Sequence, residues 1–162
     1  MSLSVVLANE EGTIKDSSSP RFLLFDLAVG GHHPSYIRYL LEHWHNEKIV
    51  GHLSIIVSPE FLEKHNDVVG LATFNSEFIA ITSDETSKLS QLNGNIKRAF
   101  AEWEIYCKYA TDLQVDHSLL MYFDHFQLPI VFGGKSPCSM SGIYFRPSFH
   151  YRHFDNHVFT LK

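Results

Sequence analysis

The chain has 162 residues, of which 44% are apolar and 19% charged, so it fits one globular domain with its own core and is neither disordered nor a coiled coil. Its net charge of -5 and the lack of clustered Lys and Arg exclude a general nucleic-acid binder. No apolar run approaches the roughly 20 residues that cross a bilayer, and the first residues lack a charged secretion-signal region, so we expect a cytoplasmic protein. Cys107 lies in a predicted helix and Cys138 in a predicted loop, a pattern that does not indicate a disulfide framework.

Residues 1–20 are rich in Ser and acidic side chains and show no sustained apolar period. This composition predicts a mobile leader with at most a short strand at Leu3–Leu7. The folded domain should therefore span residues 21–162.

The first predicted unit is a strand, a glycine turn and a helix between Arg21 and Asn46. The strand is a nearly continuous apolar run from Phe22 to Val29, interrupted by Asp26, as expected for a strand buried on both faces. Gly30 and Gly31 follow it and allow positive φ or the close approach of a ligand. The helix starts near Pro34 and has an apolar stripe at helical spacing, formed by Ile37, Leu40, Leu41 and Trp44.

The middle of the chain continues this alternation. His52–Val57 predicts a second strand, and Ser58 should cap a short helix beginning at Pro59. Residues 67–73 have an ambiguous pattern, and Glu77–Thr82 has the composition of a third strand. We expect a polar connection next, and then a long helix over residues 95–111 with apolar positions at Ile96, Phe100, Trp103, Cys107 and Ala110 and surface support from Glu104 and Lys108.

The last third predicts two more strands. Leu119–Phe123 is an unbroken apolar run typical of a central parallel strand, residues 133–142 should form a flexible loop, and residues 143–151 should form a strand that Pro147 places at an end or edge. The predicted fold class is therefore α/β: a Rossmann-like or flavodoxin-like three-layer sandwich with a mostly parallel sheet in a single domain. In such a sheet the ligand crevice lies beyond the carboxyl ends of the strands.

Two polar clusters should share that edge of the sheet. The first comprises Gly30, Gly31, His32, His33 and Ser35, where the helix N-terminus could bind phosphate, carboxylate or sugar hydroxyls, although a Gly-Gly turn can also serve only for packing. It lacks the third glycine of GxGxxG, which disfavours NAD binding. The second cluster is Asp124 and His125, suited to accepting a proton from a sugar hydroxyl or, alternatively, to capping a helix.

Other polar groups have weaker functional patterns. The histidine groups His32/His33, His43/His45 and His150/His153/His157 look like sets of metal ligands, but HExxH and CxxC pairs are missing, so we predict no metal site. Asp116 and His117 begin a strand and should be structural. Arg146 beside aromatic residues could bind a sugar ring, or the same segment could be an edge strand that buries its rings.

Three segments resemble the N-terminal half of a bacterial GT-B glycosyltransferase of the family 4-like kind found in polysaccharide or glycolipid assembly: LLFDLAVGGHHPSYIRYLLEHW, VDHSLLMYFDHFQLP and SGIYFRPSFHY. The resemblance covers most of the chain from Arg21 to Tyr151. It implies an acceptor-binding Rossmann-like domain whose Gly30–Gly31 turn lies near the diphosphate of a nucleotide-sugar donor. It also implies an acid-base or acceptor-orienting role for His33, Asp124 or His125, with no cofactor.

The chain departs from that family in lacking the C-terminal domain that holds the nucleotide sugar. Glycosyl transfer needs both the donor's charge stabilised and the acceptor positioned, so we expect little or no catalysis by this chain alone. Its expected partners are that second domain, the donor, and a saccharide or lipid-linked acceptor, with peripheral membrane contact and self-association left open. The alternative is a stand-alone, non-catalytic Rossmann-like binding or interaction module. A flavin carrier is less favoured because the first turn lacks a Ser/Thr-rich phosphate loop.

Overall fold

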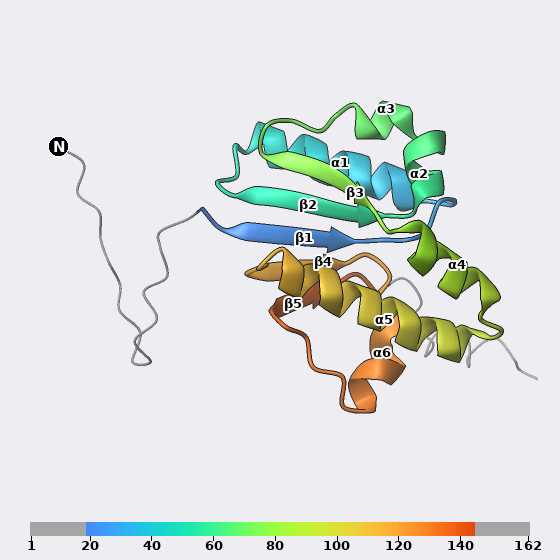
Figure 1. The fold of residues 1–162 in the computed structure, drawn as a ribbon. Coiled ribbons are helices and arrows are strands. Elements are labelled where there is room, and N and C mark those ends of the chain that lie inside the picture. The colour runs from blue at the N-terminus through green and yellow to red at the C-terminus, as the bar shows by residue number, and fades with distance from the viewer. Residues whose placement is uncertain (1–18, 145–162) are drawn as a thin grey trace, which may run out of the picture.

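The computed structural model describes residues 19–144 and shows one α/β domain built on a parallel sheet (Figure 1). Residues 1–18 of the predicted leader, the part of the predicted final strand beyond Tyr144, Arg146 and the last histidine group lie outside the described residues. The strands are β1 (Arg21–Phe25), β2 (His52–Val57), β3 (Ser76–Ala80), β4 (His117–Leu120) and β5 (Ser139–Gly142). The helices are α1 (His33–Asn46), α2 (Pro59–Lys64), α3 (Asn66–Val69), α4 (Ser83–Gln91), α5 (Asn95–Asp112) and α6 (Phe123–Val131).

The five strands follow the order β3-β2-β1-β4-β5, and every neighbouring pair is parallel. β1 is central, with Leu24 opposite Ile55 of β2 and Leu119 of β4. This order is that of a Rossmann-like sheet rather than a flavodoxin-like one. The predicted fold class is confirmed, with the Rossmann-like alternative selected.

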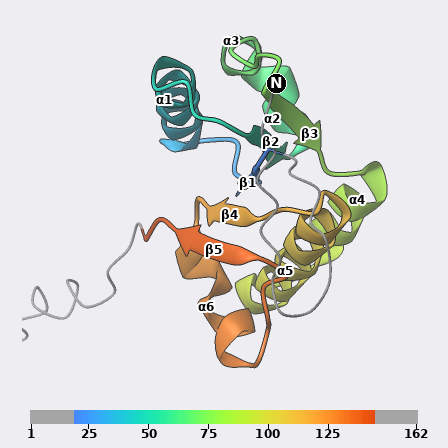
Figure 2. The same cartoon turned by 90° about the vertical axis from the view of Figure 1, so that its left-hand side faces the viewer.

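Helices cover both faces of the sheet and make three layers (Figures 1 and 2). On one face, α1, α2 and α3 pack through a core that includes Ile37, Leu41 and Phe61. On the other face, α4, α5 and α6 pack through a second core that includes Tyr106 and Phe126. Both cores share the strands, because successive strand residues point to opposite faces.

The first strand is shorter than its apolar run predicts. β1 ends at Phe25, and the Asp26 carboxylate accepts a hydrogen bond from the backbone amide of Ala28 at 3.0 Å. Such a local side-chain bond competes with the strand ladder and turns the chain away from the sheet. Residues 26–29 therefore form a loop at the carboxyl end of β1, and the prediction of a strand to Val29 is wrong.

The end of β4 also differs from the prediction. The apolar run 119–123 leaves the sheet after Leu120, and α6 starts at Phe123. The edge strand β5 lies within the predicted flexible loop, at Ser139–Gly142, and Ile143 and Tyr144 follow it outside any strand assignment. β5 is polar and largely exposed, so backbone pairing with β4 rather than an apolar pattern defines it.

The predicted polar connection contains a helix, α4. Thr82 and Glu85 form a capping box at its start: the Thr82 hydroxyl accepts from the Glu85 amide and the Glu85 carboxylate accepts from the Thr82 amide. Only Leu89 of this helix is buried, which is why its apolar period is too weak to read.

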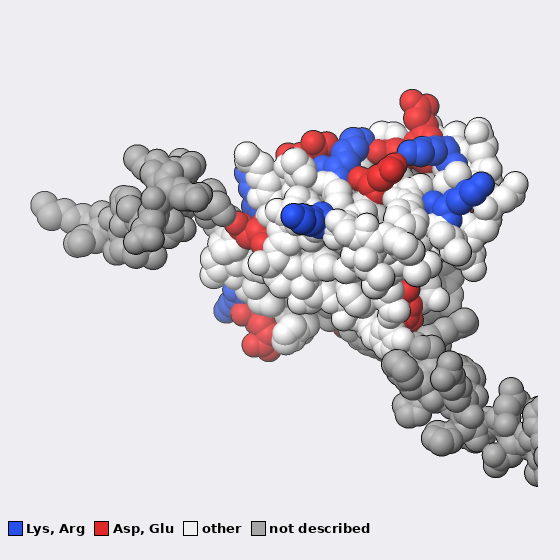
Figure 3. Space-filling view, turned by 90° about the horizontal axis from the view of Figure 1, so that it is seen from below, with Lys and Arg blue, Asp and Glu red and all other residues white. Residues whose placement is uncertain are grey.

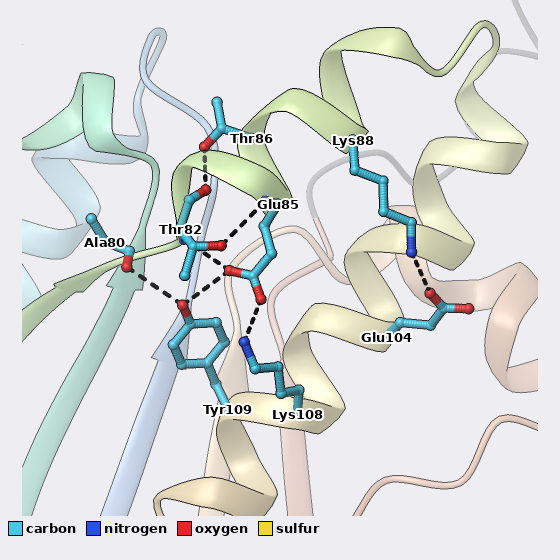
Figure 4. A network of polar contacts seen from close by, with 8 residues as sticks. All are labelled: Ala80, Thr82, Glu85, Thr86, Lys88, Glu104, Lys108 and Tyr109. Atoms are coloured by element: carbon cyan, nitrogen blue, oxygen red, sulfur yellow. Dashed lines mark hydrogen bonds and ion pairs between the residues drawn. The ribbon is translucent and has the colours of Figure 1, made fainter.

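The ion pair expected along α5 is replaced by pairs between helices (Figure 4). Lys108 Nζ lies 2.6 Å from Glu85 Oε1, and Lys88 Nζ lies 3.0 Å from Glu104 Oε2. Tyr109 Oη also donates to Glu85 Oε2 at 3.1 Å. These contacts join α4 to α5, so Glu104 and Lys108 support the packing of two helices instead of the surface of one.

Candidate functional site

The candidate site lies where the carboxyl ends of β1 and β4 meet. These strands are neighbours in the sheet, yet the chain leaves β1 toward β2 and leaves β4 toward β5, in opposite directions. Ligands of open α/β sheets bind at such a switch point. A cavity of about 190 Å³ is found here, lined by the loop after β1, by α5 and by the start of α6.

Asp26 and His33 form the most buried polar pair of this edge. The Asp26 side chain is 1% exposed, and His33 Nδ1 lies 2.7 Å from Asp26 Oδ2. The hydrogen bond from His33 to Asp26 raises the pKa of the imidazole, against the opposing effect of burial. A carboxylate that accepts from Nδ1 fixes the tautomer and orientation of the ring. An imidazole held in this way can take a proton from a hydroxyl group.

Aromatic contacts connect this pair to the second predicted cluster. The His33 ring meets Tyr122 edge to face at 5.9 Å between centroids, and Tyr122 stacks on His125 at 6.1 Å. Two segments about 90 residues apart in the sequence thus lie at the same edge of the sheet, as predicted, and the Tyr122 ring lies between His33 and His125.

The far wall of the cavity is a charged group on α5. Arg98 Nε donates to Glu102 Oε1 at 2.7 Å, and the Glu102 side chain is buried. His125 Nε2 lies 3.4 Å from Glu102 Oε2, close enough for an ion pair but without hydrogen-bond geometry. The cavity therefore presents acceptors from Asp26 and Glu102 and donors from Arg98 and His125, a mixture suited to hydroxyl groups.

The glycine turn is next to the cavity but does not line it. Gly31 has φ +69°, whereas the φ of Gly30 is not positive, and no atoms crowd either Cα. His32 occupies the N-cap of α1 without a capping bond, and Ser35 is exposed in the first turn. Of the first predicted cluster, only His33 belongs to the buried pair, with Asp26 as its partner. The turn itself is held by His65, whose Nε2 donates to the carbonyl oxygen of Val29 at 2.7 Å.

The remaining predicted residues separate into structural and cavity-lining roles. His125 lines the cavity, and Asp124 lies beside it in the first turn of α6, where a negative charge favours the helix terminus. Asp116 accepts from the Arg21 amide at 3.0 Å, and His117 lies 3.0 Å from the Ser141 hydroxyl, both at the amino end of the sheet.

Five residues of the site region were not predicted from the sequence: Asp26, His65, Arg98, Glu102 and Tyr122. A signal exists for some of them. A single carboxylate within the apolar run marks Asp26, and the i, i+4 spacing of Arg98 and Glu102 marks a pair on α5. The spacing of Arg98 and Glu102 does not tell which face of α5 the pair occupies. His65 and Tyr122 belong to no recognisable sequence pattern.

We found no protein-family model, curated protein or solved structure that matches this chain. Within residues 19–144, no three His, Cys, Asp or Glu side chains converge as metal ligands would. None of the helices in this described part is long and apolar enough to cross a bilayer.

Proposed function

We propose that this chain is the acceptor-side domain of a nucleotide-sugar-dependent glycosyltransferase, of the GT-B family 4-like kind that the sequence resembles. The observation that carries the proposal is the buried Asp26–His33 pair beside a cavity at the switch point of a Rossmann-like sheet. A glycosyl acceptor is a hydroxyl group that must lose its proton as the new bond forms. An imidazole oriented by a buried carboxylate suits that proton transfer.

The other side chains of the cavity would orient the acceptor. Glu102 supplies an acceptor, while Arg98 and His125 supply donors, so neighbouring hydroxyls of a sugar can each find a partner. Tyr122 adds an aromatic edge against which a sugar ring can pack. The chain alone supplies no site for the donor's diphosphate in this scheme, and a second domain would provide it.

An apolar surface next to the cavity supports the need for a second domain. Near the start of α5 and the end of α6, Phe100 and Phe132 lie 6.2 Å apart between ring centroids. We call the exposed group formed here the α5–α6 patch, and it consists of Ile96, Phe100, Leu128, Val131 and Phe132. Figure 3, which views the side that carries α6, shows most charged side chains in the upper part of this face, others at its left and lower edges, and uncharged surface between them. Exposed apolar groups of this kind mark interaction surfaces.

The first test separates binding from transfer. The isolated chain is titrated with the methyl glycosides of glucose, mannose and galactose while the ring resonances of His33 and His125 are followed by NMR. It is then incubated with radiolabelled UDP-glucose or GDP-mannose and octyl glucoside. We expect one glycoside to shift both rings, Asp26→Asn to abolish that shift, Ser35→Ala to leave it intact, and no sugar transfer above the buffer rate.

The second test is the size of the native product in source cells, detected with an antibody against this chain. A product well above 18.6 kDa would agree with an additional domain. A product of 18.6 kDa, no glycoside shift and no partner chain would contradict the proposal in favour of a stand-alone binding module. Sugar transfer by the isolated chain would contradict the inactivity that we assign to it.

A further inference from the structure

A second cavity lies at the opposite edge of the sheet, near the amino ends of β2 and β3. Its volume is about 600 Å³, within the range of sites for small organic ligands. The end of α1, the loop from α1 to β2 and the segment before β3 form its walls, with lining residues that include Trp44, Lys48, Val50, Phe74 and Asn75. None of these residues lines the candidate glycosyl-acceptor cavity.

Two apolar side chains of this cavity are left in solvent. Phe74 is 97% exposed and Val50 is 75% exposed, and they come from two different loops that line the cavity. Covering such side chains with an apolar group is favourable, because it removes their surface from water. The cavity thus offers an apolar surface without an occupant among the described residues.

Trp44 supplies a separate observation. Its side chain is largely buried and lines both this cavity and a neighbouring one against β1 and β4, and its indole Nε1 is closed off from solvent with no acceptor among the described residues. Buried donors in native proteins nearly always have a partner. Lys48 adds an exposed ammonium group that makes no ion pair with the described residues.

Several other polar side chains of the cavity are already paired. His45 Nε2 lies 2.9 Å from Thr73 Oγ1, which also donates to Asn75 Oδ1 at 2.8 Å. His52 Nε2 lies 3.0 Å from Glu77 Oε1. Trp44 Nε1 and Lys48 Nζ are both donors, so a ligand that pairs with them must bring acceptors.

Two parts of the wall are held in place before any ligand binds. The contact between His45 and Thr73 ties α1 to the segment before β3. Gly51 fixes the other loop: its φ is +141°, and a Cβ there would lie 2.7 Å from the Pro20 carbonyl oxygen and the Phe22 ring. A preformed site loses less entropy on binding than one that must be ordered.

We propose that this cavity binds a small amphipathic carboxylate. The carboxylate pairs with Lys48 Nζ and, after a small shift of the indole that opens Nε1 to the cavity, accepts a hydrogen bond from Trp44. The apolar part of the ligand lies against Val50 and Phe74. The site is independent of the acceptor cavity, so its binding would persist if the glycosyltransferase proposal failed.

The test follows the two indole N–H signals in nitrogen–proton NMR spectra. Trp44 and Trp103 are the only tryptophans of the chain, so Trp103, on the other face of the sheet, is an internal reference. Phenylbutyrate is the probe, and phenylbutyramide is its uncharged match. We expect a saturable downfield shift of the Trp44 signal with the acid, a weaker response to the amide, and no change at Trp103.

Variants at exposed positions test the contacts without removing core residues. Lys48→Gln and Phe74→Ala should each weaken phenylbutyrate binding by about threefold or more. Lys97→Gln, which changes an exposed lysine of α5, should leave binding unchanged. The proposal is overturned if the Trp44 signal does not saturate, if acid and amide act equally, or if both variants bind like the wild type.

Discussion

Asp26 controls the chemistry of His33 because it is the buried partner of that imidazole. The Asp26→Asn substitution should lower the pKa of His33 toward or below its ordinary value, since the hydrogen bond and the charge that raise it are lost while burial remains. An NMR titration of the ring measures this change. Glu77→Gln is the control, because it removes the carboxylate beside His52 at the other edge of the sheet. An unchanged His33 pKa in Asp26→Asn would contradict the assignment.

The same pair makes a prediction about stability. A raised pKa in the folded state means that protonated His33 favours folding. This contribution is complete below the unfolded pKa of about 6.5 and disappears as the pH rises through the folded pKa. Urea unfolding of the wild type should therefore show a loss of stability over that interval that Asp26→Asn lacks. If the wild type instead gains stability relative to the variant as the pH rises across this interval, the prediction is wrong.

His65 acts on the loop between β1 and α1. Its donor bond to Val29 holds the chain just before the glycine turn, and its ring packs on Phe61 at 4.8 Å between centroids. His65→Phe keeps a ring but removes the donor, so the free energy of unfolding, measured in urea, should fall by about 1 kcal/mol. His65→Gln keeps a donor and should recover most of that loss. An equal loss in both variants would show that the effect comes from packing and not from the hydrogen bond.

The sequence shows which residue types are available to the site but not which side chains contact one another. The isolated carboxylate at position 26 and the histidine at position 33 are visible in the sequence, and their pairing needs the loop that Asp26 itself produces. Glu102 and His125 meet because α5 and α6 pack on the same face. No spacing rule relates them, since the contact is set by the tertiary structure.

At the scale of helices and strands, the contact between α4 and α5 gives a test of electrostatics. Glu85 lies largely buried between Thr82, Lys108 and Tyr109 (Figure 4), and hydrogen bonds from Lys108, Thr82 and Tyr109 lower its pKa despite the opposing effect of burial. Glu85→Gln keeps the capping box but loses the charge. We expect a loss of about 1 kcal/mol of unfolding free energy at neutral pH, measured by urea unfolding.

The lowered pKa of Glu85 determines how its contribution to stability changes with pH. Its contribution is present above the unfolded value, about 4.3, and is lost as the pH falls through the folded pKa. The difference between wild type and Glu85→Gln should shrink over that range. Glu104→Gln, which breaks the exposed pair with Lys88, is the matched control and should cost under about 0.5 kcal/mol. A constant difference down to strong acid would contradict the role of the Glu85 charge.

The spacing of apolar residues correctly predicted the helices and strands that bury many side chains. β2 and α5 begin where the sequence indicated, because five consecutive strand residues are buried in one and many helix positions in the other. Even in α5 the apolar stripe was partly wrong: Ile96 and Phe100 are exposed, whereas Glu102 is buried. Short elements such as α4 and β5 bury few side chains, so capping and backbone pairing define them rather than apolar spacing.

At the scale of the whole molecule, strand order determines where the site forms. The sequence indicated parallel strands and a crevice at their carboxyl ends, and this follows from the alternation of strands and helices. It did not indicate that β4 lies beside β1, which brings Tyr122 and His125 to the loop after β1. Nor did it locate the α5–α6 patch, because exposed apolar residues look like core residues in a sequence.

The α5–α6 patch makes the last prediction. If it binds a second domain, the isolated chain should associate weakly with itself through the same surface, since the uncovered apolar groups favour any apolar partner. Phe132→Glu should then raise the dissociation constant of self-association by about tenfold, as measured by sedimentation velocity, because a charge would have to lose its water on contact. Phe74→Glu is the control, since Phe74 is also an exposed phenylalanine but lies at the opposite edge of the sheet. If Phe74→Glu weakens self-association and Phe132→Glu does not, the interface lies at the amino edge of the sheet. The α5–α6 patch would then no longer support the proposal of a second domain.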